Sequence, residues 1–151
     1  MGARSVEYLA DRLEIDDLLT RYATALDAGD WDHWASCFTP DAFLDYSAVG
    51  GIKGRLPEVR DWLARVMKMF PVRQHIVANR SVTIEGDTAT SLSYVFNPMG
   101  VGEPTGAMQL FFEGAAYRDR LVRTADGWRI AERVEEACYS TRLQRLLTPP
   151  A

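Results

Sequence analysis

The sequence predicts an α+β fold, in which helices come first and antiparallel strands follow. Apolar residues recur at three- and four-residue steps over residues 6–27 and 57–70, as on the buried face of a helix. After residue 72, runs rich in β-branched side chains alternate with turn signals, which is typical of strands joined by hairpins. The chain has 151 residues, so we expect one domain over residues 1–151 with a loose tail at 148–151.

The boundaries of the predicted elements come from capping and turn residues. Gly29 suits the left-handed position that follows a helix, and Asp30 can cap the next helix. Pro57 fits the first turn of a third helix, and the dipeptide Asp126-Gly127 is typical of a hairpin turn. In chain order, we expect helices over residues 6–27, 31–38 and 57–70, a turn at 39–41, strands over 42–46, 73–84, 88–97, 107–123 and 128–139, a loop over 98–106 and a closing helix over 142–147.

Composition and charge restrict the function classes. Hydrophobic residues make up 47% of the chain and charged residues 25%, the balance of a globular domain. A net charge of −4 argues against a nucleic-acid partner, because such proteins carry a concentrated basic surface. No apolar run approaches the ~18 residues of a membrane helix, and the N-terminus lacks an apolar signal core. We therefore expect a soluble, cytoplasmic protein without a membrane partner.

Three polar residues are unusual for their positions. Asp27 closes the first helix, where the helix dipole disfavours negative charge, so it is either a loop cap or a functional acid. His75 lies in a strand as either a structural residue or a base, and a base needs a carboxylate that fixes its tautomer. If the hairpin pairs Ile84 with Thr88, His75 faces Asn97 on the same side of the sheet. A one-residue slip would break this pairing.

Several other side chains allow two interpretations. Tyr22 lies on the apolar stripe of the first helix, where core packing is the default and hydrogen bonding into a pocket is the alternative. Tyr46 ends the first short strand, and both interpretations stay open there. Trp62 and Trp128 are most simply core residues. Glu113 is either a buried acid or, more simply, an outward-facing strand residue.

Other chemistries and assembly can also be judged from the residues present. With two histidines and two scattered cysteines, Cys37 and Cys138, we expect neither a disulfide framework nor a metal site. The chain lacks a glycine-rich phosphate loop and a nucleophile elbow, so no cofactor is expected. A sheet face that carries Leu92, Tyr94 and Phe96 predicts self-association as a dimer or trimer.

These residues resemble a known family. The stretch over residues 15–42, with IDDLLTRYA and LDAGDWD, resembles the opening of SnoaL-like proteins of the nuclear transport factor 2-like superfamily. RQHIVAN over residues 73–79 and DGWRI over 126–130 fit the same family, so the resemblance covers nearly the whole chain. It implies a cone in which a curved antiparallel sheet wraps around the N-terminal helices and encloses a deep apolar pocket.

Within that family, the pattern is similar to scytalone dehydratase, bile-acid 7α-dehydratase and hexachlorocyclohexane dehydrochlorinase. These enzymes use an aspartate at the end of the first helix and a histidine at the start of a later strand, which Asp27 and His75 match. Tyr22 matches a tyrosine of the bile-acid enzyme, and Tyr46 one of scytalone dehydratase. Leu26 departs from the tyrosine of scytalone dehydratase, whose second active-site histidine has no counterpart here. The dehydrochlorinase has a lysine at the position of Tyr22.

The resemblance implies a lyase of the dehydratase type without a cofactor. In this hypothesis His75 is the base, Asp27 fixes its tautomer, and Tyr22 and Tyr46 donate hydrogen bonds to developing negative charge. The substrate is small and apolar, including cyclic, polyketide-like or steroid-like compounds. An isomerase or polyketide cyclase would use the same base, and a non-catalytic ligand-binding module or oxygenase small subunit is the alternative. The residues expected to contact the substrate are Asn97, Leu26, Phe43, Trp62, Val77 and Phe112.

Overall fold

The α+β class is confirmed by the computed structural model, which describes residues 5–103 and 105–141. The predicted helix over 142–147 and the tail at 148–151 lie outside the described residues. The elements are α1 (Val6–Ala28), α2 (Trp31–Ala35), β1 (Phe38–Asp45), η1 (Ser47–Val49), β2 (Lys53–Arg55), α3 (Leu56–Val66), η2 (Met67–Met69), β3 (Val72–Arg73), β4 (Ile76–Glu85), β5 (Thr88–Gly102), β6 (Met108–Thr124) and β7 (Gly127–Ser140).

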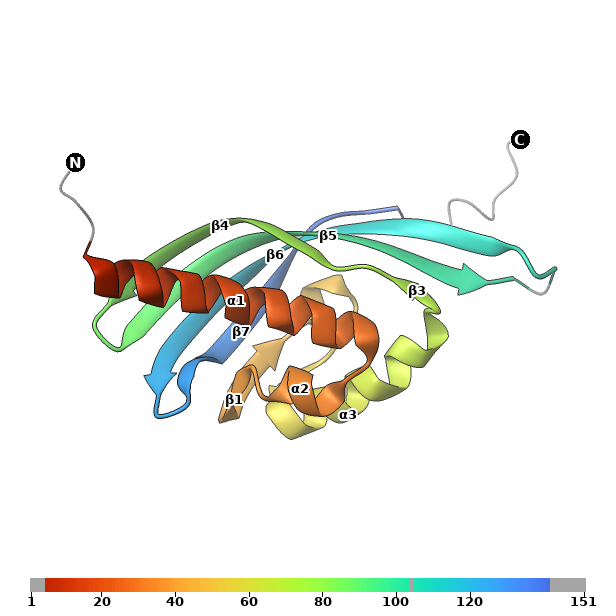
Figure 1. Cartoon of the computed structure of the whole chain (residues 1–151). Helices are drawn as coiled ribbons and strands as arrows, with labels where there is room; N and C mark the ends of the chain where they lie inside the picture. Colours follow the sequence, from red (N-terminus) through yellow and green to blue (C-terminus); the bar gives the residue numbers. More distant parts are fainter. Residues whose placement is uncertain (1–4, 104, 142–151) are drawn as a thin grey trace.

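The strands form one curved sheet in the order β2-β1-β7-β6-β5-β3, and β4 also pairs with β5. Figure 1 shows the sheet arching over α1, with α2 and α3 at one end. Neighbouring strands are antiparallel except β1 and β7, which run parallel. This pair corrects the expectation of a fully antiparallel sheet. Since no hairpin joins β1 to β7, no tight turn fixes their relative direction.

Helix α1 is shaped by its two ends. The Ser5 side chain accepts a hydrogen bond from the Tyr8 backbone N–H and caps the first turn. Gly29 ends the helix with a left-handed φ of 70°, and its N–H donates to carbonyls of the last turn. Asp27 therefore sits where the chain leaves the helix. The buried stripe of α1 is Ile15, Leu18, Leu19, Tyr22, Ala23, Ala25 and Leu26.

The C-terminal cap of α1 gives a first testable prediction. We expect Gly29→Ala to lower the free energy of unfolding by about 1–2 kcal/mol, because an L-residue is strained in the left-handed region. The added Cβ would also lie 3.2 Å from Nη2 of Arg73. Gly86→Ala is the matched control, since Gly86 has φ +60° and no atom within 4 Å of an added Cβ. Urea denaturation should show the larger loss at Gly29; equal losses would contradict a role for the Arg73 contact.

Strand β1 begins earlier than the sequence indicates. Its Phe38 pairs with Ile130 of β7, and regular pairing resumes only at Phe43. The predicted turn at residues 39–41 lies inside this interruption. Pro40 has no N–H to contribute to a ladder, so it fits a stretch where the pairing with β7 is broken.

The hairpin between β4 and β5 does not have the predicted register at its turn. Thr88 pairs with Glu85, one residue away from the predicted partner. A bulge next to Asn79, whose φ is 50°, then inserts an extra residue into β4. The bulge compensates for the slip at the turn. As a result, His75 lies beside Asn97 as predicted, although the prediction assumed a regular hairpin without a bulge.

Strand β5 continues through much of the segment predicted as a loop. Pro98 pairs with Phe112 of β6, and the ladder extends to Gly102. Pairing with β6 on one side and β3 on the other thus outweighs the local turn propensity of this segment. A Cβ at Gly100 would lie 2.9 Å from the Leu110 and Met108 side chains, so a larger residue there would require those side chains to shift.

The outer face of the sheet carries exposed aromatic side chains. Tyr94 is 49% exposed and Phe96 40% exposed, and Phe96 stacks on Phe112 with ring centroids 5.8 Å apart. Burying such a face would be favourable. Self-association of this chain stays a prediction.

Candidate functional site

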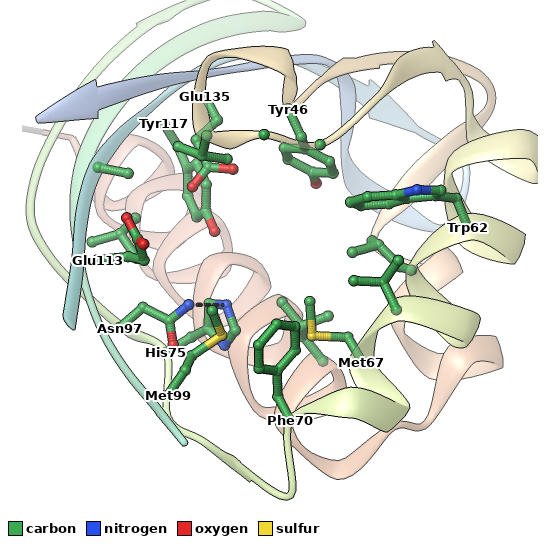
Figure 2. A pocket seen from close by; sticks show the side chains of 18 of the residues that line it. Tyr46, Trp62, Met67, Phe70, His75, Asn97, Met99, Glu113, Tyr117 and Glu135 are labelled. Carbon is green, nitrogen blue, oxygen red and sulfur yellow. Dashed lines mark hydrogen bonds between the residues drawn. The ribbon is translucent and has the colours of Figure 1, made fainter. Parts of the chain in front are cut away.

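A cavity of about 480 Å³ lies between the inner face of the sheet and helices α1 and α3 (Figure 2). Its size falls within the ~300–1,000 Å³ that is usual for small-molecule sites. Aromatic and apolar side chains make up most of the wall. Among them are Trp62, Leu63, Met67, Phe70, Met99 and Phe111.

The Asp27–His75 pair lies at the edge of this cavity. His75 Nδ1 is 2.6 Å from Asp27 Oδ1, and the His75 backbone N–H donates to Asp27 Oδ2 over 2.8 Å. Both carboxylate oxygens are thus used to hold one residue. Arg73 fixes the backbone nearby, since its Nε donates to the Asp27 carbonyl over 2.9 Å. The ring of His75 lines the cavity, whereas the carboxylate of Asp27 stands behind it.

Asn97 completes the surroundings of the imidazole. Its Nδ2 lies 3.0 Å from His75 Nε2, the contact drawn as a dashed line in Figure 2. An amide donor at Nε2 and a carboxylate at Nδ1 select the neutral tautomer that carries its proton on Nδ1. The Asn97 Oδ1 atom is buried and has no hydrogen-bond partner among the described residues.

Three tyrosines meet at another part of the wall. The Tyr22 hydroxyl lies 3.1 Å from that of Tyr46 and donates to that of Tyr117 over 3.5 Å. Burial raises the pKa of Tyr46 and of Tyr117 well above the usual value of a phenol. Arg133 lies between the rings of Tyr22 and Tyr117, 4.0 Å from each centroid. The cluster therefore presents neutral hydroxyl donors backed by a buried cation.

Two carboxyl groups line the same cavity. Glu113 of β6 accepts a hydrogen bond from Ser140 Oγ over 2.5 Å. Glu135 of β7 has no hydrogen bond from any of the described residues, and burial raises its pKa to about 7. The neighbouring Glu113 raises the pKa of Glu135 further, whereas Arg133 opposes the shift.

The residues predicted to contact a substrate divide into two groups. Leu26, Trp62 and Asn97 line the cavity. Three others lie outside it: Phe43, Val77 and Phe112.

Strand alternation explains the three corrections. Ala42 and Leu44 of β1 are buried, as is Tyr46 just after it, so Phe43 faces outward, near the Arg55 guanidinium. Phe112 is 38% exposed because Phe111 and Glu113 occupy the inner face of β6. Val77 is buried in the core, away from the cavity.

The sequence interpretation missed Tyr117 and Glu135 altogether. Trp128 and Ile130 are buried, and continued alternation from them would turn Glu135 outward. In the structure, Ala131 is an extra residue in the ladder between β6 and β7, so the alternation shifts by one after it. The bulge places Arg133 and Glu135 on the inner face. A local bulge of this kind leaves no turn residue in the sequence that could reveal it.

In the part of the chain that the structure describes, no group of His, Cys, Asp or Glu side chains could hold a metal ion. Within those same residues, no helix is long and apolar enough to cross a membrane.

The fold agrees with comparisons to known proteins. The sequence profile of the SnoaL-like domain matches residues 7–134. The chain belongs to the SnoaL-like family. An uncharacterized protein of Mycobacterium tuberculosis is 47% identical over 135 residues, which cover 89% of this chain and 90% of that protein. The name of this relative brings no activity to the comparison.

Solved structures of several other proteins share the architecture. A proposed aromatic ring hydroxylase from Novosphingobium aromaticivorans is 28% identical with a TM-score of 0.78, covering 88% of this chain and 93% of that one. A hexachlorocyclohexane dehydrochlorinase is 20% identical with a TM-score of 0.79, covering 96% and 97%. A proposed scytalone dehydratase from Novosphingobium aromaticivorans is 17% identical with a TM-score of 0.74, covering 89% and 88%. The last two show the fold alone.

Proposed function

We propose that this chain is a cofactor-independent lyase that removes a proton from carbon and eliminates water from a small, apolar compound. The observation that carries the proposal is the Asp27–His75 pair, with the imidazole on the cavity wall. The dehydratase and dehydrochlorinase names among structures of the same fold support this reaction class. The largely apolar lining of the cavity supports a small hydrophobic substrate.

His75 acts as the general base in this proposal. Asp27 accepts a hydrogen bond from Nδ1, which leaves the lone pair of Nε2 directed at Asn97 and the cavity. Substrate displaces the Asn97 amide from Nε2, and the C–H proton moves to that nitrogen. The carboxylate then stabilises the imidazolium that forms. If the Asn97 amide turns over, its unpartnered Oδ1 can accept the new N–H of the ring.

The tyrosine cluster supplies the second requirement, which is stabilisation of negative charge. Proton loss beside a carbonyl places charge on the carbonyl oxygen, and preorganised hydroxyl donors lower the energy of that state. Tyr22 and Tyr46 both line the cavity and already share a hydrogen bond. Arg133, stacked on Tyr22, adds positive potential without contacting the substrate directly.

An Asp27→Asn variant tests the role of the carboxylate. The probe is the aldol of benzaldehyde and acetone, here called the hydroxy ketone probe, whose dehydration gives the ultraviolet-absorbing enone benzylideneacetone. A hydrogen bond to a charged group is worth ~1.5–3 kcal/mol, so we expect a loss of roughly 10- to 150-fold in kcat/KM. Asp41→Asn, an exposed site away from the cavity, is the matched control. Equal activity of Asp27→Asn and Asp41→Asn would exclude the proposed pair.

The product of the same assay separates elimination from isomerisation. A lyase gives a product lighter by one water, whereas an isomerase that uses the same base gives a product of unchanged mass. Mass spectrometry of the reaction mixture therefore distinguishes the two outcomes. An unchanged mass with a normal rate of proton exchange would favour the isomerase.

A further inference from the structure

We propose that Glu135 is the acid of this site: a neutral carboxyl group that gives its proton to the leaving hydroxyl of the substrate. The inference rests on the proposed function, because it names the group that acts opposite His75. It also narrows the substrate to a neutral compound with a hydroxyl leaving group.

Glu135 shares one wall of the cavity with the base. In Figure 2, Glu135 and His75 lie toward opposite ends of the wall formed by the sheet, with Glu113 between them. The strand register agrees with this order, since Glu135 on β7 pairs with Tyr117 of β6, and Glu113 of β6 pairs with Asn97 of β5. A bound molecule can therefore meet the base at one end and a carboxyl group at the other.

The surroundings of Glu135 disfavour a charged carboxylate. Among the described residues, no N–H or O–H donates to it, whereas Glu113 receives the Ser140 hydroxyl. The nearby cation makes no ion pair with it: Arg133 binds Asp119 through Nε and Nη2 at 2.7 Å, and its Nη1 has no hydrogen-bond partner among the described residues. A carboxyl group without donors in an apolar cavity is more stable when protonated. Two carboxyls on one wall thus have different environments, which is typical of different chemical roles.

The tyrosines are less suited to this proton transfer. Burial raises the pKa of Tyr46 and Tyr117, so these phenols hold their protons tightly and serve better as hydrogen-bond donors. A general acid is most effective when its pKa lies near the working pH. Glu135, whose pKa is raised to about 7 by burial, meets that condition.

The proposed step is balanced in atoms and charge. The C–H bond breaks, its proton goes to His75 Nε2, and the electron pair moves into the carbonyl to give an enolate with its charge on oxygen. The enolate then returns to the ketone and forms the new C=C bond as the C–O bond breaks, and the leaving oxygen takes the proton of Glu135 and departs as water. The site returns to its starting state when a proton passes from the imidazolium to the Glu135 carboxylate through solvent that enters the emptied cavity.

The charges of the wall also define the substrate. Glu113 and Glu135 face the cavity, and no lysine or arginine is among the described residues that line it. A carboxylate substrate or a leaving halide would find no cationic partner there. A neutral hydroxy ketone or a related hydroxy compound fits, because its hydroxyl needs a proton in order to leave.

A pair of probes with different leaving groups tests the assignment. The hydroxy ketone probe must be protonated to lose water, whereas its acetate ester loses acetate without an acid. We expect Glu135→Gln to slow the hydroxy ketone by about 100-fold or more and to leave the ester within about threefold. Glu136→Gln, at an exposed neighbouring position, is the matched control. Equal slowing of both probes by Glu135→Gln, or of neither, would overturn the inference.

The pH profile gives a second readout. The acid must be protonated, so wild-type turnover of the hydroxy ketone should fall as pH rises through about 7. Glu135→Gln should lose this alkaline limb. The ester should lack the limb in both proteins. A wild-type alkaline limb that persists unchanged in Glu135→Gln would assign it to another group and overturn the inference.

Failure of the inference is distinguishable from failure of the proposed function. Loss of His75 should slow both probes if the function is correct, whatever Glu135 does. If wild type turns over neither probe, the function fails for hydroxy ketones, and carbon-13 NMR then decides the inference. The carboxyl signal of Glu135, assigned by difference from Glu135→Gln, should titrate near 7 and shift when the hydroxy ketone binds. Titration near the ordinary ~4.3 of a glutamate, or no shift with the probe, would overturn it.

Discussion

Replacing His75 by alanine is expected to lower the turnover of the hydroxy ketone probe by about 10²–10⁴-fold, the usual contribution of a positioned general base. This corresponds to about 3–5 kcal/mol of activation free energy. The variant removes the only group that receives the proton in the proposed step. Because the side chain of His75 is only 6% exposed and is tied to Asp27, its loss also opens space beside that carboxylate.

A second histidine provides the control for this variant. His33 lies in α2 on an exposed side of the molecule, so His33→Ala should leave turnover unchanged. Circular dichroism and thermal unfolding would show that both variants are folded. Near-full turnover by folded His75→Ala, with the true substrate or either probe, would rule out the proposed base.

Parts of the fold could be predicted because local chemistry and tertiary packing agree there. In α1, the apolar stripe and Gly29 indicate the same helix, so its end, at Ala28, is predicted from the sequence to within one residue. The extension of β5 beyond Pro98 could not be predicted in that way. The hydrogen-bonded ladders with β3 and β6 outweigh the turn propensity of its residues, and the sequence of one strand does not indicate which strands will pair with it.

The candidate site was predictable where it did not depend on which face of a strand a residue occupies. Asp27 and His75 come from helix-end and strand-start positions, and their pairing needs no assumption about the register of the sheet. The choice of Phe112 over Phe111 depends on strand alternation, where an error of one residue exchanges the inner and outer faces. Glu135 depends on the extra residue at Ala131, and nothing local marks that residue.

The buried ion pair behind the tyrosines carries the second large prediction. We expect Arg133→Met to lower the free energy of unfolding by about 3–5 kcal/mol, because it leaves a buried carboxylate without its partner. Arg133 and Asp119 have fully buried side chains and are joined by two 2.7 Å hydrogen bonds. The guanidinium also lies 4.0 Å from the Tyr22 and Tyr117 rings, whose packing should loosen with it. Urea denaturation measures the loss.

Two further variants separate the charge from the packing. Arg118→Met removes an exposed ion pair with Glu136 and should cost no more than about 1 kcal/mol. Adding Asp119→Leu to Arg133→Met should recover much of the loss, because the uncompensated charge is then gone. If the double variant is as unstable as Arg133→Met alone, the cost comes from the lost stacking on the tyrosines. In that case the cation supports the shape of the cavity wall more than it balances the charge of Asp119.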